Sequence, residues 1–344
     1  MREIPTVDMS DLFFRELGIP EPDVNLGVGG GSHAVNTAEI MKRFEQVCLE
    51  QQPQVVMVVG DVDSTIACGL VAVKLGIALV HVEAGLRSFD RTMPEEINRL
   101  LTDAISDLLL CTEQSGVDNL LREGVDPARI HLVGNVMIDT LLRNRERAEQ
   151  SDILERLGLQ AGGYGVVTLH RPSNVDRPET FEPIVDALEE IQQELPLVFP
   201  VHPRTRARLA STAPWRRIES LLNVHLIDPL GYLEFLKLMS SARIVVTDSG
   251  GMQEETTILG VPCLTLRENT ERPVTTQLGS SILVGNRTER ILEGFRTFMS
   301  NPPRYQVPPL WDGRAAERIV DVIARTWLNT DPADERSTLV AQDS

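Results

Sequence analysis

The chain is organised around Val245-Val246-Thr247-Asp248-Ser249-Gly250-Gly251-Met252-Gln253-Glu254-Glu255, an apolar run that ends in a polar, glycine-containing turn. This pattern predicts a β-strand that leads into the N-terminus of a helix. The first backbone N–H groups of a helix have no partner within the helix, and two glycines let a ligand approach the main chain closely. The pattern therefore indicates a phosphate site, with a capped helix and a solvated acidic first turn as the alternative.

The residues that follow extend this pattern. A second apolar strand is expected at 261–266, and the polar segment Arg267-Glu268-Asn269-Thr270-Glu271-Arg272-Pro273 comes directly after it. Glu255 falls one turn further along the helix, within reach of a sugar hydroxyl pair beside a bound pyrophosphate. This ordered set of segments is more specific than a lone glycine-rich turn.

Composition limits the classes of function. With 344 residues, 42% of them hydrophobic, the chain can form two domains with sizeable cores. Its formal net charge of -17 argues against nucleic acid or an anionic membrane surface as a partner, so an anionic ligand needs a locally basic pocket. No apolar run reaches membrane-spanning length, and residues 1–20 lack a signal-peptide pattern. The four cysteines lack metal-site spacing, which predicts reduced thiols in a cytoplasmic protein.

Apolar, β-branched runs alternate with amphipathic segments along the whole chain, which predicts α/β architecture with doubly wound parallel sheets. We expect strands at 24–28, 54–59, 78–82, 107–111, 130–133, 165–169, 197–201, 224–227, 245–247 and 261–266. The main helices are expected at 8–18, 34–50, 65–75, from 94 onward, 113–123, 135–149, up to 194, 232–240, 288–299 and 313–327. The predicted domains are 1–150 and 151–312, followed by a helix at 313–328 that packs on the first domain and by an acidic, disordered tail at 329–344.

Several acids follow predicted strands of the first domain. Ligands of open α/β sheets bind at the carboxyl ends of the strands, where Asp61 and Glu83 are expected to lie. Glu95 begins a helix nearby. Taken singly, Asp61 could cap a helix, and Glu95 could be an i, i+4 partner of Arg99.

Taken together, these segments resemble the non-hydrolysing UDP-N-acetylglucosamine 2-epimerases, relatives of the two-domain glycosyltransferases. The resemblance is carried by Gly-Asp at one strand end, His-Val-Glu-Ala-Gly-Leu-Arg at the next, Pro-Glu-Glu-x-Asn-Arg, Leu-His-Arg-Pro, Asp-Ser-Gly-Gly-x-Gln-Glu-Glu and Glu-Asn-Thr-Glu-Arg-Pro, in that order. It runs from about residue 9 to about residue 328. It implies two Rossmann-like domains that face a cleft, as in the glycosyltransferase-B fold.

The resemblance also implies roles for individual residues. The family's catalytic groups match Asp61, Glu83, Glu95 and His170. Its UDP contacts match Ser249, Gly250, Gly251, Glu255, Arg272 and Phe235, and His202 and Arg99 are further candidates. The remaining histidines are expected to be loop or core residues, namely His33, His81, His131 and His225.

The activity implied is reversible C2 epimerisation of UDP-N-acetylglucosamine to UDP-N-acetylmannosamine for cell-surface polysaccharide precursors. The reaction eliminates UDP to form 2-acetamidoglucal and then adds it back, without a cofactor or a metal, in a homodimer. Two alternatives stay open: a 2-epimerase of a modified UDP-sugar such as a diacetamido-uronic acid, or a UDP-sugar-binding protein without catalysis.

The N-terminus departs from the family pattern. Family members begin with one more strand and helix, and that strand carries a Gly-Thr-Arg-Pro-Glu segment with a lysine nearby. A strand-helix piece of roughly 30 residues is therefore expected to be missing before the helix at 8–18. Either the start codon is misplaced, or the chain is a truncated paralogue.

Overall fold

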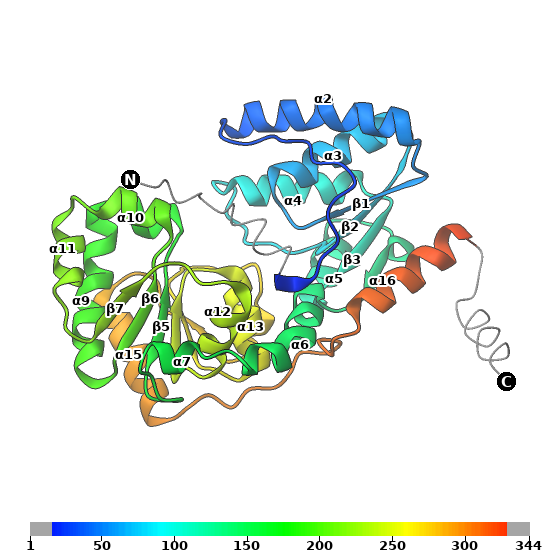
Figure 1. Cartoon of the computed structure of the whole chain (residues 1–344). Coiled ribbons are helices and arrows are strands. Elements are labelled where there is room, and N and C mark those ends of the chain that lie inside the picture. Colours follow the sequence, from blue (N-terminus) through cyan, green and yellow to red (C-terminus); the bar gives the residue numbers. More distant parts are fainter. Residues whose placement is uncertain (1–15, 329–344) are drawn as a thin grey trace. The chain divides into compact units, whose positions relative to one another are not determined.

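The computed structural model describes residues 16–328, which form two compact units, each built on a parallel sheet (Figure 1). Of the described residues, the first-sheet unit contains 24–139 and 309–328. The second-sheet unit contains 140–308 and 16–23. The predicted α/β class with two parallel sheets is confirmed.

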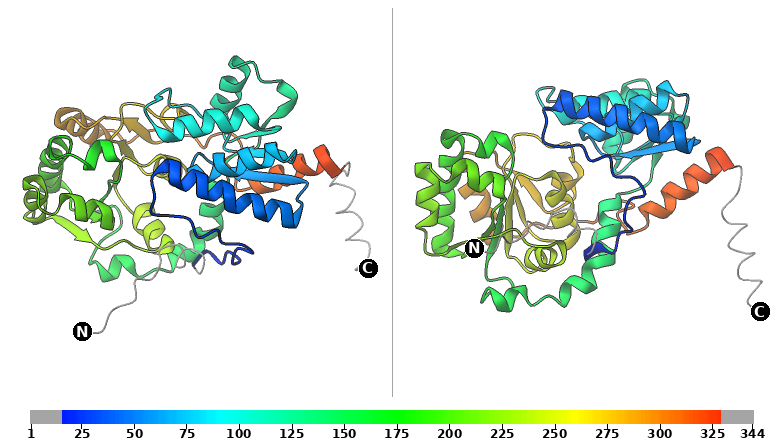
Figure 2. Two further views of the ribbon diagram at one scale, coloured as in Figure 1. Left: turned by 90° about the horizontal axis from the view of Figure 1, so that it is seen from above. Right: turned by 45° about the horizontal axis from the view of Figure 1, so that its top comes forward.

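The first-sheet unit has four strands in the order β1-β2-β3-β4. Helices cover both faces of this sheet. Val56 and Val58 of β1 pack beneath α2 and α3, which lie side by side in both views of Figure 2. Ile319 of α16 packs against β2 and β3 on the other face. The elements are β1 (Val55–Val59), β2 (Ala78–Val82), β3 (Leu108–Cys111), β4 (Ile130–Leu132), α2 (His33–Gln51), α3 (Asp63–Lys74), α4 (Pro94–Ile105), α5 (Gln114–Arg122), the 3-10 turn η1 (Pro127–Arg129), α16 (Ala315–Ile323) and the π-helical turn η2 (Ala324–Leu328).

The second-sheet unit has six strands in the order β10-β9-β8-β5-β6-β7. Successive residues of the central strands point to opposite faces: Val166 and Val245 pack with α12 and α13, whereas Val167 and Val246 pack with α9 and α15. The elements are α7 (Ile153–Arg156), β5 (Gly165–Thr168), α8 (Pro172–Val175), α9 (Pro178–Glu194), β6 (Leu197–Pro200), α10 (Pro203–Leu209), α11 (Ala213–Glu219), β7 (Val224–Ile227), α12 (Tyr232–Ser240), β8 (Ile244–Thr247), α13 (Gly250–Leu259), β9 (Cys263–Thr265), α14 (Val274–Gln277), β10 (Ser281–Leu283) and α15 (Thr288–Ser300).

The strand order of this second sheet creates a switch point. From β5 the chain continues to β6 on one side, whereas β8 pairs with β5 on the other side. The loops after β5 and β8 therefore diverge to opposite faces. Doubly wound sheets bind their ligands at the carboxyl ends of such a strand pair.

The boundary between the units differs from the predicted one. Helix α6 (Val136–Glu149) begins in the first-sheet unit, but its later residues Leu141 and Ala148 pack with Val166 of the second sheet. Arg147 of the same helix donates a hydrogen bond to the carbonyl of Glu16 at 2.6 Å, so residues 16–23 also belong to the second-sheet unit.

Nine of the ten predicted strands are confirmed to within three residues. The strand predicted at 24–28 is wrong, because this segment pairs with no strand among residues 16–328. Gly27 has a φ of 58°, which interrupts the extended chain, and the Arg43 guanidinium occupies the carbonyls of Leu26 and Gly27. Strand β10 was not predicted.

The helix predicted at 8–18 lies almost wholly outside the described residues, as does the tail at 329–344. None of the helices in the described part of the chain is long and apolar enough to cross a membrane.

Candidate active site

His170 and Asp248 meet at the switch point of the second sheet. His170 follows β5, and its Nδ1 lies 3.0 Å from Oδ1 of Asp248, which follows β8 and is fully buried. Asp248 also accepts hydrogen bonds from the backbone N–H groups of His170 and Arg171 and from the amide of Asn174. Burial by itself would raise the pKa of the Asp248 carboxyl, but His170 and these donors hold it below its ordinary value.

The helix that follows Asp248 begins at a glycine for a steric reason. Ser249 is the N-cap residue of α13, and within the described chain its side chain makes no capping hydrogen bond. A Cβ on Gly250 would lie 2.7 Å from Glu271 Oε1 and 2.8 Å from an Arg272 guanidinium nitrogen. Only glycine therefore lets this arginine lie against the first turn of α13, where backbone N–H groups favour an anion.

Arg272 is held in place by two buried carboxylates. Its Nε lies 2.7 Å from Glu254, and its guanidinium also pairs with Glu271. Arg267 pairs with Glu271 at 2.5 Å. Burial favours the neutral form of Glu271, but the two arginines outweigh it and hold the pKa of this carboxyl well below its usual range. The guanidinium of Arg272 is thus fixed beside Gly250.

Glu255 lies one helical turn further along α13 and is 6% exposed. Burial raises the pKa of its carboxyl to about 7, although the Tyr232 hydroxyl, 3.4 Å away, opposes that shift. Burial thus favours the neutral form of the Glu255 carboxyl.

A cavity of about 370 Å³ opens beside these residues, entirely within the second-sheet unit. Four predicted site residues line it: His170, His202, Phe235 and Ser249. Its wall is mostly apolar, with the rest of the lining supplied by Thr168, Leu169, Pro200, Pro229, Leu230, Tyr232 and Met252. An apolar pocket with a few polar groups at one end suits a ligand that has a flat ring and a charged tail.

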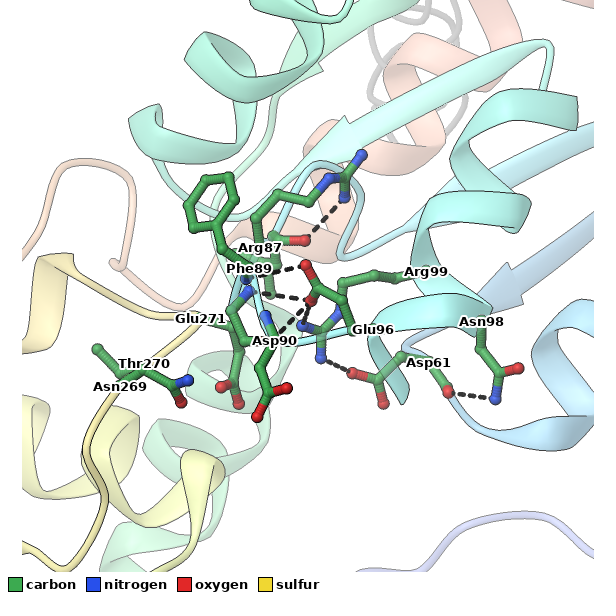
Figure 3. A network of polar contacts seen from close by, with 12 residues as sticks. Asp61, Arg87, Phe89, Asp90, Glu96, Asn98, Arg99, Asn269, Thr270 and Glu271 are labelled. Carbon is green, nitrogen blue, oxygen red and sulfur yellow. Dashed lines mark hydrogen bonds and ion pairs between the residues drawn. The ribbon is translucent and has the colours of Figure 1, made fainter. Parts of the chain in front are cut away.

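In the first-sheet unit, Arg99 connects two carboxylates (Figure 3). It pairs with Asp61 at the end of β1 and, at 2.6 Å, with the buried Glu96 of its own helix. Glu96 also accepts hydrogen bonds from the N–H groups of Ser88 and Phe89. This network ties the loop after β2 to the end of β1.

The two alternative interpretations of these acids are wrong. Asp61 does not cap a helix, because the N-cap residue of α3 is Val62. Arg99 pairs with Glu96 and Asp61, and among residues 16–328 no hydrogen bond or ion pair engages the Glu95 carboxylate.

Glu83 has an unusual backbone. Its φ is 70°, a left-handed conformation that residues other than glycine rarely adopt. It lies at the end of β2, beside β1, and is partly exposed. Backbone strain of this kind is concentrated at functional sites.

Some polar residues of the two networks were not predicted as site residues, namely Asp248, Arg171 and Glu96. For Asp248 a signal existed, since it directly follows the apolar run and lies two residues before Gly250. His81 is expected to be a loop or core histidine, and its 0% exposure makes it a core residue. In the described part of the chain, no group of three or more His, Cys, Asp or Glu side chains could hold a metal ion.

The chain has two α/β units, each with a parallel sheet, and in one of them a helix that begins at Gly250 lies at the switch point. This arrangement is that of a two-domain protein of the glycosyltransferase-B-like class. Within this class the chain belongs to the UDP-N-acetylglucosamine 2-epimerase family, whose sequence profile matches residues 6–324.

Individual relatives agree with this assignment. The chain is 42% identical over 321 residues to the UDP-N-acetylglucosamine 2-epimerase of Methanocaldococcus jannaschii, covering 92% of this chain and 87% of the relative. It is 41% identical over 322 residues to the UDP-2,3-diacetamido-2,3-dideoxy-D-glucuronate 2-epimerase of Pseudomonas aeruginosa, covering 92% and 88%. The crystal structure of the M. jannaschii enzyme in complex with UDP-GlcNAc and UDP superposes with a TM-score of 0.86 at 42% identity, over 92% of this chain and 88% of that one.

Proposed function

We propose that this protein interconverts UDP-N-acetylglucosamine and UDP-N-acetylmannosamine by inverting the configuration at C2 of the sugar. The observation that carries the proposal is the cavity at the ends of β5 and β8, where His170, oriented by the buried Asp248, lies beside Ser249 at the start of α13. Membership in the family and the UDP-GlcNAc complex of the M. jannaschii relative support it.

UDP would bind to the second-sheet unit. The backbone N–H groups of Ser249, Gly250 and Gly251 and the guanidinium of Arg272 suit the pyrophosphate, since both favour negative charge. The buried carboxylate of Glu255 suits the ribose hydroxyls, because it can accept hydrogen bonds that these hydroxyls donate. Phe235 and the apolar wall of the cavity suit the uracil ring.

Inversion at C2 needs bond changes at two neighbouring carbons. A base removes the C2 hydrogen as a proton, its electron pair forms a C1–C2 double bond, and the C1–O bond breaks with its electrons on UDP. The product pair is 2-acetamidoglucal and UDP. A proton then returns to C2 from the opposite face, and UDP adds back at C1. The enzyme must hold UDP throughout and place an acid or base on each side of C2.

The candidates for proton transfer are three carboxylates. Asp61 follows β1, Glu83 follows β2, and Glu95 lies in the first turn of α4. Arg99 orients the Asp61 carboxylate through their ion pair. His170 lines the cavity with its Nδ1 engaged by Asp248, so its Nε2 would be the ring nitrogen that assists departure of the phosphate oxygen.

Incubation with UDP-N-acetylglucosamine in D2O tests the proposal. We expect a mixture of the two UDP-sugars, with deuterium at C2 of the product and trace 2-acetamidoglucal. A product without deuterium would exclude proton removal at C2. Binding of UDP without any turnover would instead favour a UDP-sugar-binding protein that does not catalyse.

A second candidate is 2-epimerisation of a diacetamido-uronic acid attached to UDP. Its specific support is the 41% identity to the P. aeruginosa enzyme, which is almost the same as the 42% identity to the M. jannaschii enzyme. Both substrates share the UDP end, so the UDP-site residues do not discriminate between them. A comparison of kcat/KM for the two UDP-sugars decides this point.

A further inference from the structure

Two buried side chains that are not among the candidate site residues lie between the strand ends that carry Asp61 and Glu83. His81 on β2 is 0% exposed, and Asp103 on α4 is 2% exposed. The Nε2 of His81 lies 2.8 Å from the carbonyl oxygen of Gly60, the residue before Asp61. Its Nδ1 lies 2.6 Å from Oδ1 of Asp103. His81 thus connects the end of β1 to α4.

The other oxygen of Asp103 reaches the end of β2. Oδ2 accepts the backbone N–H of Gly85 at 3.1 Å and lies 2.7 Å from an Arg87 guanidinium nitrogen. Gly85 comes two residues after Glu83. A single buried carboxylate therefore holds the turn that contains Glu83, and through His81 it also holds the turn that contains Asp61.

The turn after β2 needs such support because Glu83 adopts a left-handed backbone conformation, with a φ of 70°. Strain of this kind persists only where the surrounding structure fixes it. Hydrogen bonds that hold the turn include those from the N–H of Ala84 to Leu110, from the N–H of Gly85 to Asp103, and from the amide of Asn119 to the carbonyl of Gly85. The bond to Asp103 also connects this turn, through His81, to the carbonyl of Gly60 at the neighbouring strand end.

Both ring nitrogens of His81 are engaged inside the core. The carbonyl oxygen of Gly60 can only accept, so Nε2 carries a hydrogen. Nδ1 lies against the Asp103 carboxylate, which also accepts the N–H of Gly85 and pairs with Arg87. The ring is therefore held at both of its nitrogens.

We propose that His81 and Asp103 are positioning residues of the proposed epimerase, setting the placement of the Asp61 and Glu83 carboxylates without touching the substrate. This inference rests on the proposed function. A displacement of about 1 Å at reacting groups can cost on the order of 100-fold in rate. The residues that suit UDP lie in the second-sheet unit, so loss of the His81 bridge should lower kcat and leave UDP affinity unchanged.

The test compares His81→Ala, His81→Gln and Asp103→Asn with a control, Leu79→Ala. Leu79 is equally buried on β2, but at the opposite end of the strand from Glu83. We expect kcat per folded molecule to fall on the order of 100-fold in His81→Ala and Asp103→Asn, with KM nearly unchanged. His81→Gln should recover part of this loss, because a glutamine amide can donate to the Gly60 carbonyl. Leu79→Ala should lose stability but keep its kcat.

Equal kcat values in His81→Ala and Leu79→Ala would overturn the inference, since the bridge would then serve stability alone. The ¹⁵N spectrum of the wild-type histidine rings gives a readout that needs no turnover. Nε2 of His81 should carry a slowly exchanging hydrogen, because it faces the Gly60 carbonyl, and an unprotonated Nε2 would also overturn the inference. Inactivity of the wild-type protein would instead refute the proposed function.

Discussion

The Nδ1 of His170 lies 3.0 Å from Oδ1 of Asp248, and the same carboxylate accepts the backbone N–H of His170. Asp248 therefore fixes both the main chain and the ring of this histidine. Because Nδ1 is engaged, Nε2 is the ring nitrogen that can act on a ligand in the cavity. A half-exposed imidazole with a fully buried carboxylate behind it is an arrangement that orients a proton donor or acceptor.

Replacing Asp248 by asparagine should reduce turnover more than nucleotide binding. The amide cannot accept all the donors that now converge on the carboxylate, so the His170 ring loses its fixed orientation. We expect kcat to fall by about 10²–10⁴-fold, the contribution of one positioned acid or base. UDP affinity from calorimetry should change by less than about tenfold.

The matched control for that substitution is Asp186→Asn, on α9, whose carboxylate is 46% exposed and pairs with Arg217. Asp186→Asn should leave both kcat and UDP affinity unchanged. Equal losses of turnover and UDP affinity in Asp248→Asn would mean that the carboxylate maintains the cavity and does not specifically orient His170.

Glu255 predicts a pH dependence of stability. Its pKa is about 7 in the folded protein, against 4.5 for an ordinary glutamate. Between these values the unfolded chain binds fewer protons than the folded protein, so the contribution of Glu255 to stability is fully present below about pH 4.5 and is lost as the pH rises through about 7. The loss attributable to this group is on the order of 3 kcal/mol. Urea unfolding at several pH values should show this slope flattened in Glu255→Gln but retained in the exposed control Glu190→Gln.

Nucleoside binding should be linked to the same titration. If ribose hydroxyls donate to Glu255, binding favours its ionised form and releases a proton near pH 7, so affinity rises with pH. Uridine is the better probe, because a terminal phosphate has a pKa of about 6 and would release protons of its own. Calorimetry in two buffers of different ionisation enthalpy measures the release. Identical enthalpies in both buffers would exclude a contact between Glu255 and the ribose.

Gly250→Ala should weaken UDP binding without disturbing the helix. Alanine is the better helix former, but its Cβ would displace Glu271 and Arg272, which lie 2.7 and 2.8 Å from that position. We expect UDP affinity to fall by about tenfold or more, equivalent to about 1.4 kcal/mol. Gly29→Ala is the control, since nothing lies within 4 Å of the added carbon. Unchanged UDP affinity in Gly250→Ala would place the pyrophosphate elsewhere.

The sequence predicted the central strands well because these parallel strands are covered on both faces. The run 244–247 is fully buried and rich in β-branched residues, which favours a strand. The run 55–59 is also apolar, but Met57 and Val59 are exposed, so only one face of this strand is covered. The segment at 24–28 has similar residues but no sheet partner, since Arg43 takes its carbonyls and Gly27 turns the chain. Local pattern does not reveal such a long-range contact.

The candidate site was predictable in part for the same reason. Strand ends are visible in the sequence, so Asp61, Glu83 and His170 could be assigned to them. Residues that act through burial could not be found this way. Asp248 and Glu96 are acids whose importance lies in how many donors surround them, which depends on packing between distant elements.

Glu95 and Glu96 give the sharpest contrast, because they are adjacent in the sequence and have opposite environments. Glu96 is 1% exposed and accepts hydrogen bonds from Ser88, Phe89 and Arg99. Glu95 is partly exposed, and within residues 16–328 nothing is hydrogen-bonded to its carboxylate. The first turn of α4 thus presents one acid to the core and one to solvent.

Replacing each acid by glutamine should therefore have a different effect: Glu96→Gln should lower stability, and Glu95→Gln should lower kcat. Glu96→Gln breaks a buried ion pair and should cost about 3 kcal/mol of stability in urea unfolding. Glu95→Gln should change stability by less than about 0.5 kcal/mol, as exposed substitutions do, yet lower kcat by about 10²-fold or more if Glu95 transfers a proton at C2. Full activity in Glu95→Gln would remove it from the chemistry and leave Asp61 and Glu83 as the proton-transfer groups. Loss of activity without loss of stability in Glu96→Gln would mean that the loop at 88–89, not the fold, depends on this carboxylate.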